Sequence, residues 1–479
     1  MNSLNPQNGQ AKSRLLWYFS LVTVLFFIWG FLTSMNDILI PYLKGAFDLT
    51  YFQSMLVQFA FFTAYFVGSL IYFIISIVSG DPIARIGYKN GIVLGLLVSA
   101  LGAFLFYPAA SLVSYPFFLM ALFVLGLGFT LLQISANPYV AILGTESTAS
   151  SRLNLSQGFN SLGTTLAPIT GGFLIFSYFK DASGASSVVV PYLLFAGSLA
   201  ALTVIFFFIK LPSVAANEKL ERKPVALRFP QLRWGMAAIF FYVGAEVAVG
   251  SILINFLQLD HIAGLDEEAG SIYVSIYWGG LMIGRFLGAI SLSKGMEQMQ
   301  KILWMAVAAV ACCVVIFGAI FLKEGGLDHP EKFPIQTFLP FLILVAINFA
   351  GFLLGRSAAA KTLMLFSFTC VVLLAIGIVG VGNWALWAVI GVGLFNSIMW
   401  SNIFTMAIEG LGKYKSQGSS LLVMMIIGGA LLPPLQGAIA DSSGDVQLSM
   451  LVPLVAYFYL AFYGWIYPKL IHSQKDINA

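Results

Sequence analysis

Charged residues are scarce in this sequence. Lys, Arg, Asp and Glu make up 9% of the 479 residues, whereas soluble domains carry about 25%, and 59% of the chain is hydrophobic. This composition excludes a soluble globular protein and predicts a polytopic membrane protein. The net charge of +4 is small and gives no indication of a nucleic-acid partner.

Cysteine and histidine are also rare. No disulfide framework and no redox or metal role is indicated for Cys312, Cys313 and Cys370, which all lie in apolar runs. Polar loops hold or adjoin all three histidines, which are His261, His329 and His472. No Walker loop, HExxH motif or credible nucleophile triad occurs, so we expect neither an enzyme nor an ATP-driven pump, and no cofactor.

Long apolar runs fill the chain instead. A membrane helix needs about 20 mostly apolar residues, and fourteen runs meet this need. The runs lie near residues 16–43, 51–79, 91–113, 115–142, 153–178, 189–211, 234–259, 270–293, 302–322, 335–356, 362–380, 384–408, 416–439 and 447–468. The first run is too long for a signal-peptide core, so we expect it to be an uncleaved span.

The basic residues of the loops support an even number of spans. Loops on the side of the N-terminus carry 19 Lys and Arg residues, whereas the opposite loops carry only Lys44, Lys180, Lys323 and Lys332. Since cytoplasmic loops collect Lys and Arg, both termini are predicted to be cytoplasmic. We expect the protein in a bacterial inner membrane.

Short matches recur between the two halves of the chain. Gly126, Gly128 and Asn137 recur as Gly391, Gly393 and Asn402 at an offset of 265, and Gly163, Pro168 and Gly171 recur as Gly429, Pro434 and Gly437 at 266. Ser54 and Ser271, at the starts of spans two and eight, are offset by only 217. The difference between 265 and 217 indicates an insertion of about 48 residues after the eighth span.

We therefore predict an all-α fold with a 6+6 repeat and two extra helices inserted in the C-terminal half. The predicted domains are an N-terminal bundle at 1–212, a linker at 213–233 and a C-terminal bundle at 234–479, with the inserted pair at about 302–356. The basic residues of the linker leave open a second role as a regulatory or anionic-lipid patch. Gly and Pro clusters in spans five and thirteen predict close contacts and bent helices.

An ionisable carboxylate interrupts the first apolar run. Asp37 follows Asn36 in the stretch Trp29–Pro41, where a charge costs roughly 2.5–3.5 kcal/mol on insertion scales. Such residues usually face a water-filled path or a partner, so Asp37 is predicted to mark an ion or substrate route. The alternative is a carboxylate that is hydrogen-bonded between helices only for packing.

Other polar side chains recur at the depth where repeat-built transporters bind their substrates. Together with Asn36, they are Gln133, Asn137, Gln157, Asn160, Glu246, Trp278, Asn396, Trp400 and Asn402. Amides both donate and accept hydrogen bonds, so they match paired sugar hydroxyls, and an indole can cover the apolar face of a pyranose. Each residue has a structural alternative, namely an amide that joins two helices or a packed tryptophan. Together they predict a path for a neutral, hydroxyl-rich solute.

Several motifs resemble those of a known family. They are Asn36-Asp-Ile-Leu-Ile-Pro41, Ser135-Ala-Asn-Pro-Tyr139, Gln157-Gly-Phe-Asn-Ser-Leu-Gly163, Phe241-Tyr-Val-Gly-Ala-Glu246, Gly280-Leu-Met-Ile-Gly-Arg-Phe286, Phe395-Asn-Ser-Ile-Met399 and Gly428-Gly-Ala-Leu-Leu-Pro433. The chain resembles the fucose–galactose–glucose branch of the major facilitator superfamily, and the loop Gly80–Lys89 is similar to a degenerate form of that superfamily's loop signature. The resemblance implies a monomeric sugar–cation symporter that works by alternating access.

One departure bears on the coupling ion. In the fucose–proton symporters a glutamate stands where this chain has Gln133, and an amide stands where it has Glu246. The glucose/galactose relatives resemble this chain in the exchange, and sodium coupling is found among them. The resemblance thus favours Na⁺ at Asp37, with Glu246 as its partner in cation coupling, over H⁺.

Four other functions remain open from the sequence. A proton-coupled fucose-type sugar symporter is the first alternative within transport. A fourteen-span drug–proton antiporter is the second, although such exporters usually insert their extra helices between the halves. A membrane enzyme that handles lipid-linked sugar and a sugar sensor without transport are the alternatives from other classes.

Overall fold

The computed structural model describes residues 9–79, 82–143, 149–179, 187–209, 211, 225–291, 296–324, 335–355, 358–411 and 415–478. Within these residues the secondary structure is helical and contains no strand. Most of the predicted linker, 212–224, and residues 80–81 of the loop signature lie outside the described residues.

Fourteen helical segments account for the fourteen predicted spans. Twelve described helices are long and apolar enough to cross a membrane. The fifth span is α7 (Ala149–Gly172), which continues as the π-helix η2 (Phe173–Tyr178), and the tenth is the shorter apolar helix α12 (Leu339–Gly355). The predicted number of spans is therefore confirmed.

The chain forms two compact units that do not follow the predicted domain boundaries. The first unit comprises Met1–Thr33, Ala60–Gly163 and Phe179–Arg222, and the second comprises Ser34–Phe59, Thr164–Tyr178 and Lys223–Ala479. Parts of α1 (Gly9–Phe47), α2 (Tyr51–Ser79) and α7 thus pack with the helices of the C-terminal half. The boundaries drawn from the repeat stay a prediction.

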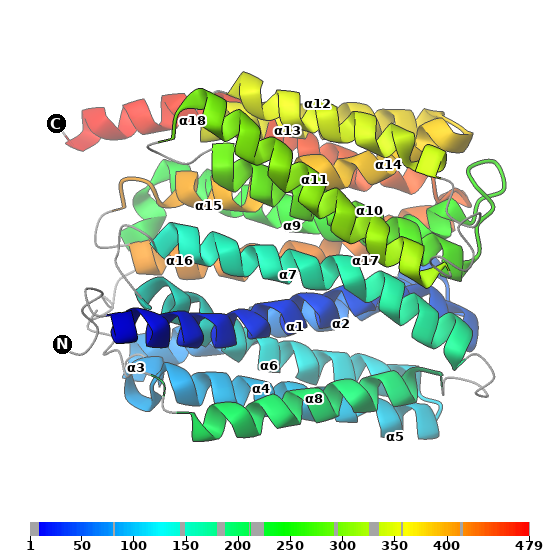
Figure 1. The fold of residues 1–479 in the computed structure, drawn as a ribbon, viewed down its shortest axis with the longest axis horizontal. Coiled ribbons are helices and arrows are strands. Elements are labelled where there is room, and N and C mark those ends of the chain that lie inside the picture. Colours follow the sequence, from blue (N-terminus) through cyan, green and yellow to red (C-terminus); the bar gives the residue numbers. More distant parts are fainter. Residues whose placement is uncertain are drawn as a thin grey trace. The chain divides into compact units, whose positions relative to one another are not determined.

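The first unit is built around α4 (Tyr88–Phe104), which packs along α6 (Tyr115–Ile142) and α8 (Val189–Phe208) (Figure 1). Gly102 of α4 lies so close to the backbone of Leu125 that a Cβ atom would clash there, which explains the tight α4–α6 contact. The short helices α3 (Pro82–Ile86) and α5 (Phe106–Ser111) complete the described part of this unit.

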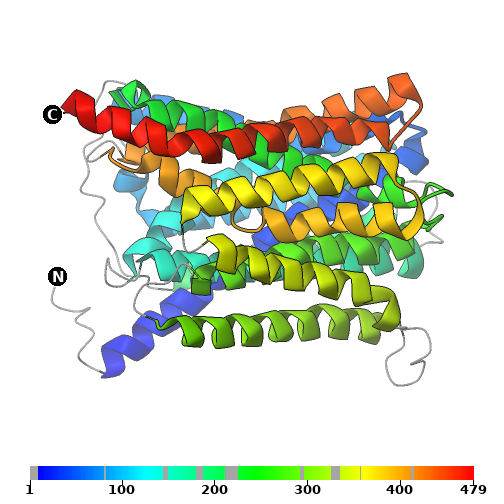
Figure 2. The same ribbon diagram turned by 90° about the horizontal axis from the view of Figure 1, so that it is seen from above.

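The second unit holds the remaining helices. They are α9 (Pro230–Leu257), α10 (Glu267–Ser291), α11 (Gln298–Lys323), α12, α13 (Ala359–Val379), α14 (Gly382–Asn396), α15 (Met399–Ile408), α16 (Lys415–Met424), α17 (Gly428–Ser443) and α18 (Leu451–Asn478). Helix α9 and the span formed by α14 and α15 make up its core, since they are 83% and 89% buried. Figure 2 shows α11, in yellow-green, along the margin of this unit, and only 22% of its span is buried.

The packing confirms the repeat and the inserted pair. Helix α4 contacts α6 and α8, and α13 contacts α14 and α18 in the same way. Since α14 matches α6 in the sequence repeat, α13 is the counterpart of α4, and α11 and α12 are the insertion. Ser54 and Ser271 also make the same bond, because each hydroxyl donates to the main-chain oxygen three residues earlier.

Four spans are interrupted rather than merely bent. In span three, a turn at Leu105 separates α4 from α5. Ser397 and Ile398 separate α14 from α15, and the 3₁₀ turn η9 (Met425–Ile427) separates α16 from α17. In span five, the π-helix η2 follows Gly171 and Gly172 directly. Glycine and proline therefore predicted the irregular spans five and thirteen, whereas the break in span twelve has no such signal at its own residues.

Candidate functional site

Asp37 lies in the C-terminal third of α1 and is only 2% exposed. Its carboxylate accepts hydrogen bonds from three side chains. Oδ1 accepts Gln58 Nε2 at 3.0 Å and Ser251 Oγ at 3.3 Å, and Oδ2 accepts the indole Nε1 of Trp278 at 2.8 Å. Because hydrogen bonds to charged groups contribute roughly 1.5–3 kcal/mol each, these donors offset the cost of burying the carboxylate.

Gln58 connects Asp37 to Asn36. The Asn36 Nδ2 donates to Gln58 Oε1 at 3.2 Å, and Gln58 Nε2 also donates to Ser251 Oγ at 2.8 Å. Asn36 is fully buried, and its Oδ1 has no hydrogen-bond partner among the described residues. A buried carbonyl oxygen without a donor is unusual and has room in its bonding for a further donor or a cation.

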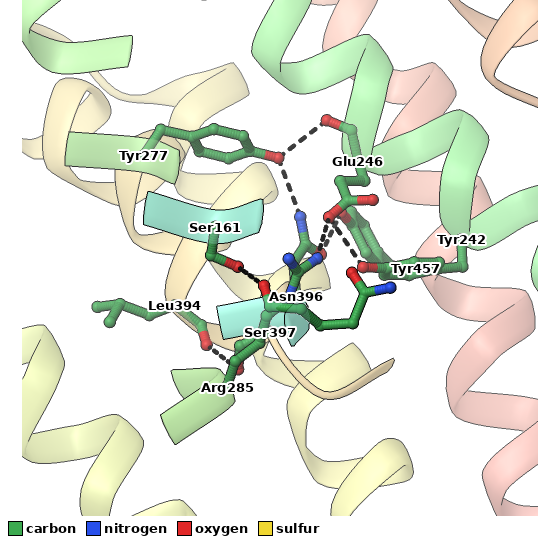
Figure 3. A network of polar contacts seen from close by, with 10 residues as sticks. Ser161, Tyr242, Glu246, Tyr277, Arg285, Leu394, Asn396, Ser397 and Tyr457 are labelled. Atoms are coloured by element: carbon green, nitrogen blue, oxygen red, sulfur yellow. Dashed lines mark hydrogen bonds and ion pairs between the residues drawn. The ribbon is translucent and has the colours of Figure 1, made fainter. Parts of the chain in front are cut away.

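Glu246 lies on α9 in a second polar cluster (Figure 3). Its Oε1 accepts the hydroxyl of Tyr242, one helical turn earlier, at 2.8 Å. The guanidinium of Arg285 on α10 lies 3.9 Å from the same oxygen. Glu246 therefore has a cationic partner, whereas the donors described above for Asp37 are neutral.

Asn396 belongs to the cluster around Glu246. The Tyr277 hydroxyl donates to the main-chain oxygen of Glu246 at 2.9 Å and accepts from Asn396 Nδ2 at 2.9 Å. The Tyr457 hydroxyl donates to Asn396 Oδ1 at 2.6 Å. These bonds join α9, α10, α14 and α18, so the Asn396 amide is engaged in holding four helices together (Figure 3).

The two clusters are neighbours along the chain. Tyr277 bonds the Glu246 cluster, and the next residue, Trp278, bonds Asp37. On α9, Ser251 follows Glu246 by five residues. The structure thus brings Asn36, Asp37 and Trp278 together in one cluster and Glu246 and Asn396 in the other.

Two predicted amides bond to main-chain atoms of a neighbouring helix. Asn160 Nδ2 donates to the main-chain oxygen of Phe26 at 3.0 Å, and Asn402 Nδ2 donates to that of Ala359 at 3.1 Å. These are the helix-joining contacts expected under the structural alternative. Trp400 is half-buried and its ring stacks with Phe404.

The remaining predicted amides lie in the first unit. Gln133 and Asn137 are half-buried on α6, and Gln157 is half-buried on α7. Asn137 Oδ1 is a buried oxygen that has no hydrogen-bond partner in the described part of the chain. A described cavity of about 500 Å³ is lined by Glu409 and Tyr467, among others, but by none of the predicted site residues.

Among the residues that donate hydrogen bonds to the two carboxylates, the sequence predicted Trp278 but missed Gln58, Ser251 and Tyr242. These three residues, and Tyr457 beside Asn396, gave no signal of their own, because polar residues of these types are ordinary in membrane helices. Arg285 could have been found, since an ionisable residue inside a span is a functional candidate by default.

The chain is similar to known proteins over nearly its whole length. The family model described as the Major Facilitator Superfamily matches residues 22–328. The glucose/galactose transporter of Brucella abortus is 41% identical, with 97% of this chain and 98% of that protein covered. The L-fucose-proton symporter of Escherichia coli is 29% identical, with 95% and 94% covered.

Solved structures match as well. A crystal structure of the E. coli fucose:proton symporter has a TM-score of 0.62 and 26% identity, with 95% of this chain and 99% of that chain covered. A structure of the fucose transporter in the outward conformation also has a TM-score of 0.62, at 27% identity and the same coverage.

Proposed function

The chain belongs to the Major Facilitator Superfamily and, within it, to the sugar transporters, and we propose that it couples the uptake of a hexose to the entry of a cation. The observation that carries this proposal is the buried Asp37 carboxylate, whose described donors are neutral and come from α2, α9 and α10. A cation at this carboxylate would change the contacts of helices from both sequence repeats.

The substrate is a hexose such as glucose or galactose. This choice is supported by the 41% identity to a glucose/galactose transporter over 97% of the chain. Sugar hydroxyls find matching amides in Gln133, Asn137 and Gln157 of the first repeat and an indole in Trp278 of the second. Three other predicted amides already donate a hydrogen bond to a neighbouring helix, so they have fewer donors left for sugar hydroxyls. They are Asn160, Asn396 and Asn402.

The coupling ion is Na⁺, with H⁺ as the alternative. Hard cations take oxygen ligands, and the oxygens on offer are the Asp37 carboxylate, the unpartnered Asn36 Oδ1 and the Ser251 hydroxyl. Glu246 is paired with Arg285, which makes Asp37 the carboxylate that needs a cation. A proton on Asp37 would neutralise it equally well, as the relationship to a fucose–proton symporter suggests.

The mechanism follows from the cost of a bare charge in a dry site. The cation neutralises Asp37 and thereby lowers the free energy of closing the helices around it. Sugar binds to the predicted amides and to Trp278. Closure is favoured when both ligands are bound, which gives symport by alternating access.

The transporter works as a monomer in the bacterial inner membrane with both termini in the cytoplasm. The placement rests on the distribution of basic residues between the loops and on the bacterial relatives.

Proteoliposomes test the proposal directly. Labelled glucose, galactose and fucose are offered for counterflow, and then for uptake under a Na⁺ gradient and a pH gradient imposed separately. We expect counterflow of glucose or galactose and accumulation driven by the Na⁺ gradient. Accumulation driven by the pH gradient alone would replace Na⁺ by H⁺, and counterflow of no hexose would refute sugar transport.

A further inference from the structure

The donors around Asp37 occupy three of the roughly four lone-pair directions of its carboxylate. Two hydrogens point at Oδ1, from Gln58 and Ser251, and the indole hydrogen of Trp278 points at Oδ2. The Asp37 side chain is 2% exposed, so water does not compete for these oxygens. The carboxylate is thus compensated by the protein itself.

The Trp278 bond conflicts with a cation at the same oxygen. An indole N–H only donates, and it has no lone pair to turn toward a cation. The indole nitrogen lies 2.8 Å from Oδ2, and the positive hydrogen between them repels a cation that approaches the same oxygen. Cation binding at Oδ2 is therefore more favourable once Trp278 has moved away.

The donors divide between the two sequence repeats. Asp37 and Gln58 come from the first two spans of the N-terminal half, whereas Ser251 and Trp278 come from the first two spans of the C-terminal half. Alternating access moves one repeat against the other. The bonds from Ser251 and Trp278 to Asp37 are therefore made in one conformation of the carrier and broken in another.

We propose that Trp278, with Ser251 and Gln58, takes the place of the coupling cation on Asp37 and so allows the empty carrier to return. This proposal rests on the proposed function. The binding site of a symporter must change from one side of the membrane to the other either with both ligands bound or with neither. An Asp37 carboxylate without a partner would hinder this change in the empty protein. When the cation binds, it displaces the Trp278 N–H, and the indole becomes available to the sugar.

Transport kinetics separate the empty return from the loaded crossing. Exchange with saturating sugar and cation on both sides of the membrane needs no empty crossing, whereas net uptake needs one in every cycle. Trp278→Phe keeps an aromatic ring and removes the N–H. We expect the ratio of net uptake to exchange to fall at least tenfold in Trp278→Phe and severalfold in Ser251→Ala, relative to the unsubstituted protein.

A tryptophan outside the Asp37 cluster supplies the control. Trp387 of α14 packs against Tyr273, Phe338 and Phe341, and we expect Trp387→Phe to keep the ratio of the unsubstituted protein. If Trp278→Phe does not fold, Ser251→Ala, which removes one hydroxyl, decides by the same ratio.

The outcomes are distinct. If Trp278→Phe lowers net uptake and exchange by the same factor, the ratio stays unchanged, and this inference alone is overturned. Trp278 would then serve only as a surface for sugar. The same outcome in Ser251→Ala has the same meaning where that variant decides. An absence of hexose exchange in the unsubstituted protein would overturn the proposed function, and this inference with it.

Discussion

Two buried carboxylates in the same unit have opposite kinds of partners. Glu246 lies 3.9 Å from the Arg285 guanidinium, whereas the described hydrogen bonds to Asp37 come from an amide, a hydroxyl and an indole. The charge of Glu246 is already compensated by Arg285, so Glu246 binds a coupling ion less favourably than Asp37 does. At the scale of the residue, this difference distinguishes the surroundings of the two acids and supports the proposal that Asp37 binds the coupling ion, whereas the coupling role expected for Glu246 stays a prediction.

Removing one partner of the Glu246–Arg285 pair should destabilise the protein. Arg285→Gln leaves Glu246 buried without its cation, and breaking a buried pair costs roughly 3–5 kcal/mol. The expected result is a clearly lower Tm in detergent, with partial recovery in the double variant Glu246→Gln, Arg285→Gln. Lys323→Gln is the control, because the Glu268 side chain that it leaves unpaired is 40% exposed and can be hydrated, whereas that of Glu246 is 11% exposed. An equal Tm for Arg285→Gln and Lys323→Gln would show that the Glu246–Arg285 pair does not stabilise the fold.

At this scale the sequence predicted the acids but not their surroundings. Asp37 and Glu246 stand out because a carboxylate inside a span is rare. Ser251 and Gln58 are 193 residues apart in the chain, and nothing local to either one indicates that both reach Asp37. Asn160 and Asn402 show the converse, since an amide that bonds a neighbouring backbone looks the same in sequence as one that binds sugar.

At the scale of the element, the start of α2 depends on a residue from α17. The main-chain N–H groups of Tyr51 and Phe52 donate to the two carboxylate oxygens of Asp441 at 2.9 and 2.8 Å. Helix α10, the counterpart of α2 in the repeat, instead receives its cap from Asp266 in its own chain segment. An anion at a helix N-terminus is stabilising, so Asp441 ties the end of α17 to the start of α2.

Asp441→Ala should loosen this contact between α2 and α17. Loss of a helix cap costs about 1 kcal/mol, which shifts an equilibrium between closed and open ends by roughly fivefold. Spin labels on Phe59→Cys of α2 and Ser442→Cys of α17, with the three native cysteines replaced by serine, report the separation of the two helices. We expect the distance distribution to extend to longer values in Asp441→Ala.

Asp445 provides the control for this measurement. Its Oδ1 accepts the N–H groups of Gln447 and Leu448 within the same segment, so Asp445→Ala removes a cap without touching α2. Identical distance distributions for Asp441→Ala and the parent would show that the contact does not hold the two helices together.

The sequence predicted the elements well and their irregularities less well. Apolar runs long enough to span a membrane follow from composition, because an exposed backbone in lipid must form a helix. The Gly and Pro clusters indicated where α7 and α17 depart from a straight helix. The break at Ser397 and Ile398 was not predicted, since neither residue disfavours a helix strongly.

At the scale of the whole molecule, the 6+6 repeat can still be recognised although a pair of helices is inserted in its second half. The change of offset from 217 to 265 located the insertion, and the packing of α13 in the place of α4 confirms it. The division into two compact units could not be predicted, because it depends on which ends of α1, α2 and α7 pack against the C-terminal helices. The repeat is a pattern of matching residues in the sequence, whereas the two units reflect which helix segments contact one another.

The Asp37→Asn variant tests the central claim most directly. The account predicts that proteoliposomes with this variant exchange labelled hexose across the membrane but do not accumulate it under a Na⁺ or pH gradient, because an amide carries no charge for the cation to neutralise. Asp48→Asn, on the exposed loop before α2, is the control and should accumulate hexose normally. Full gradient-driven accumulation by Asp37→Asn would contradict the account.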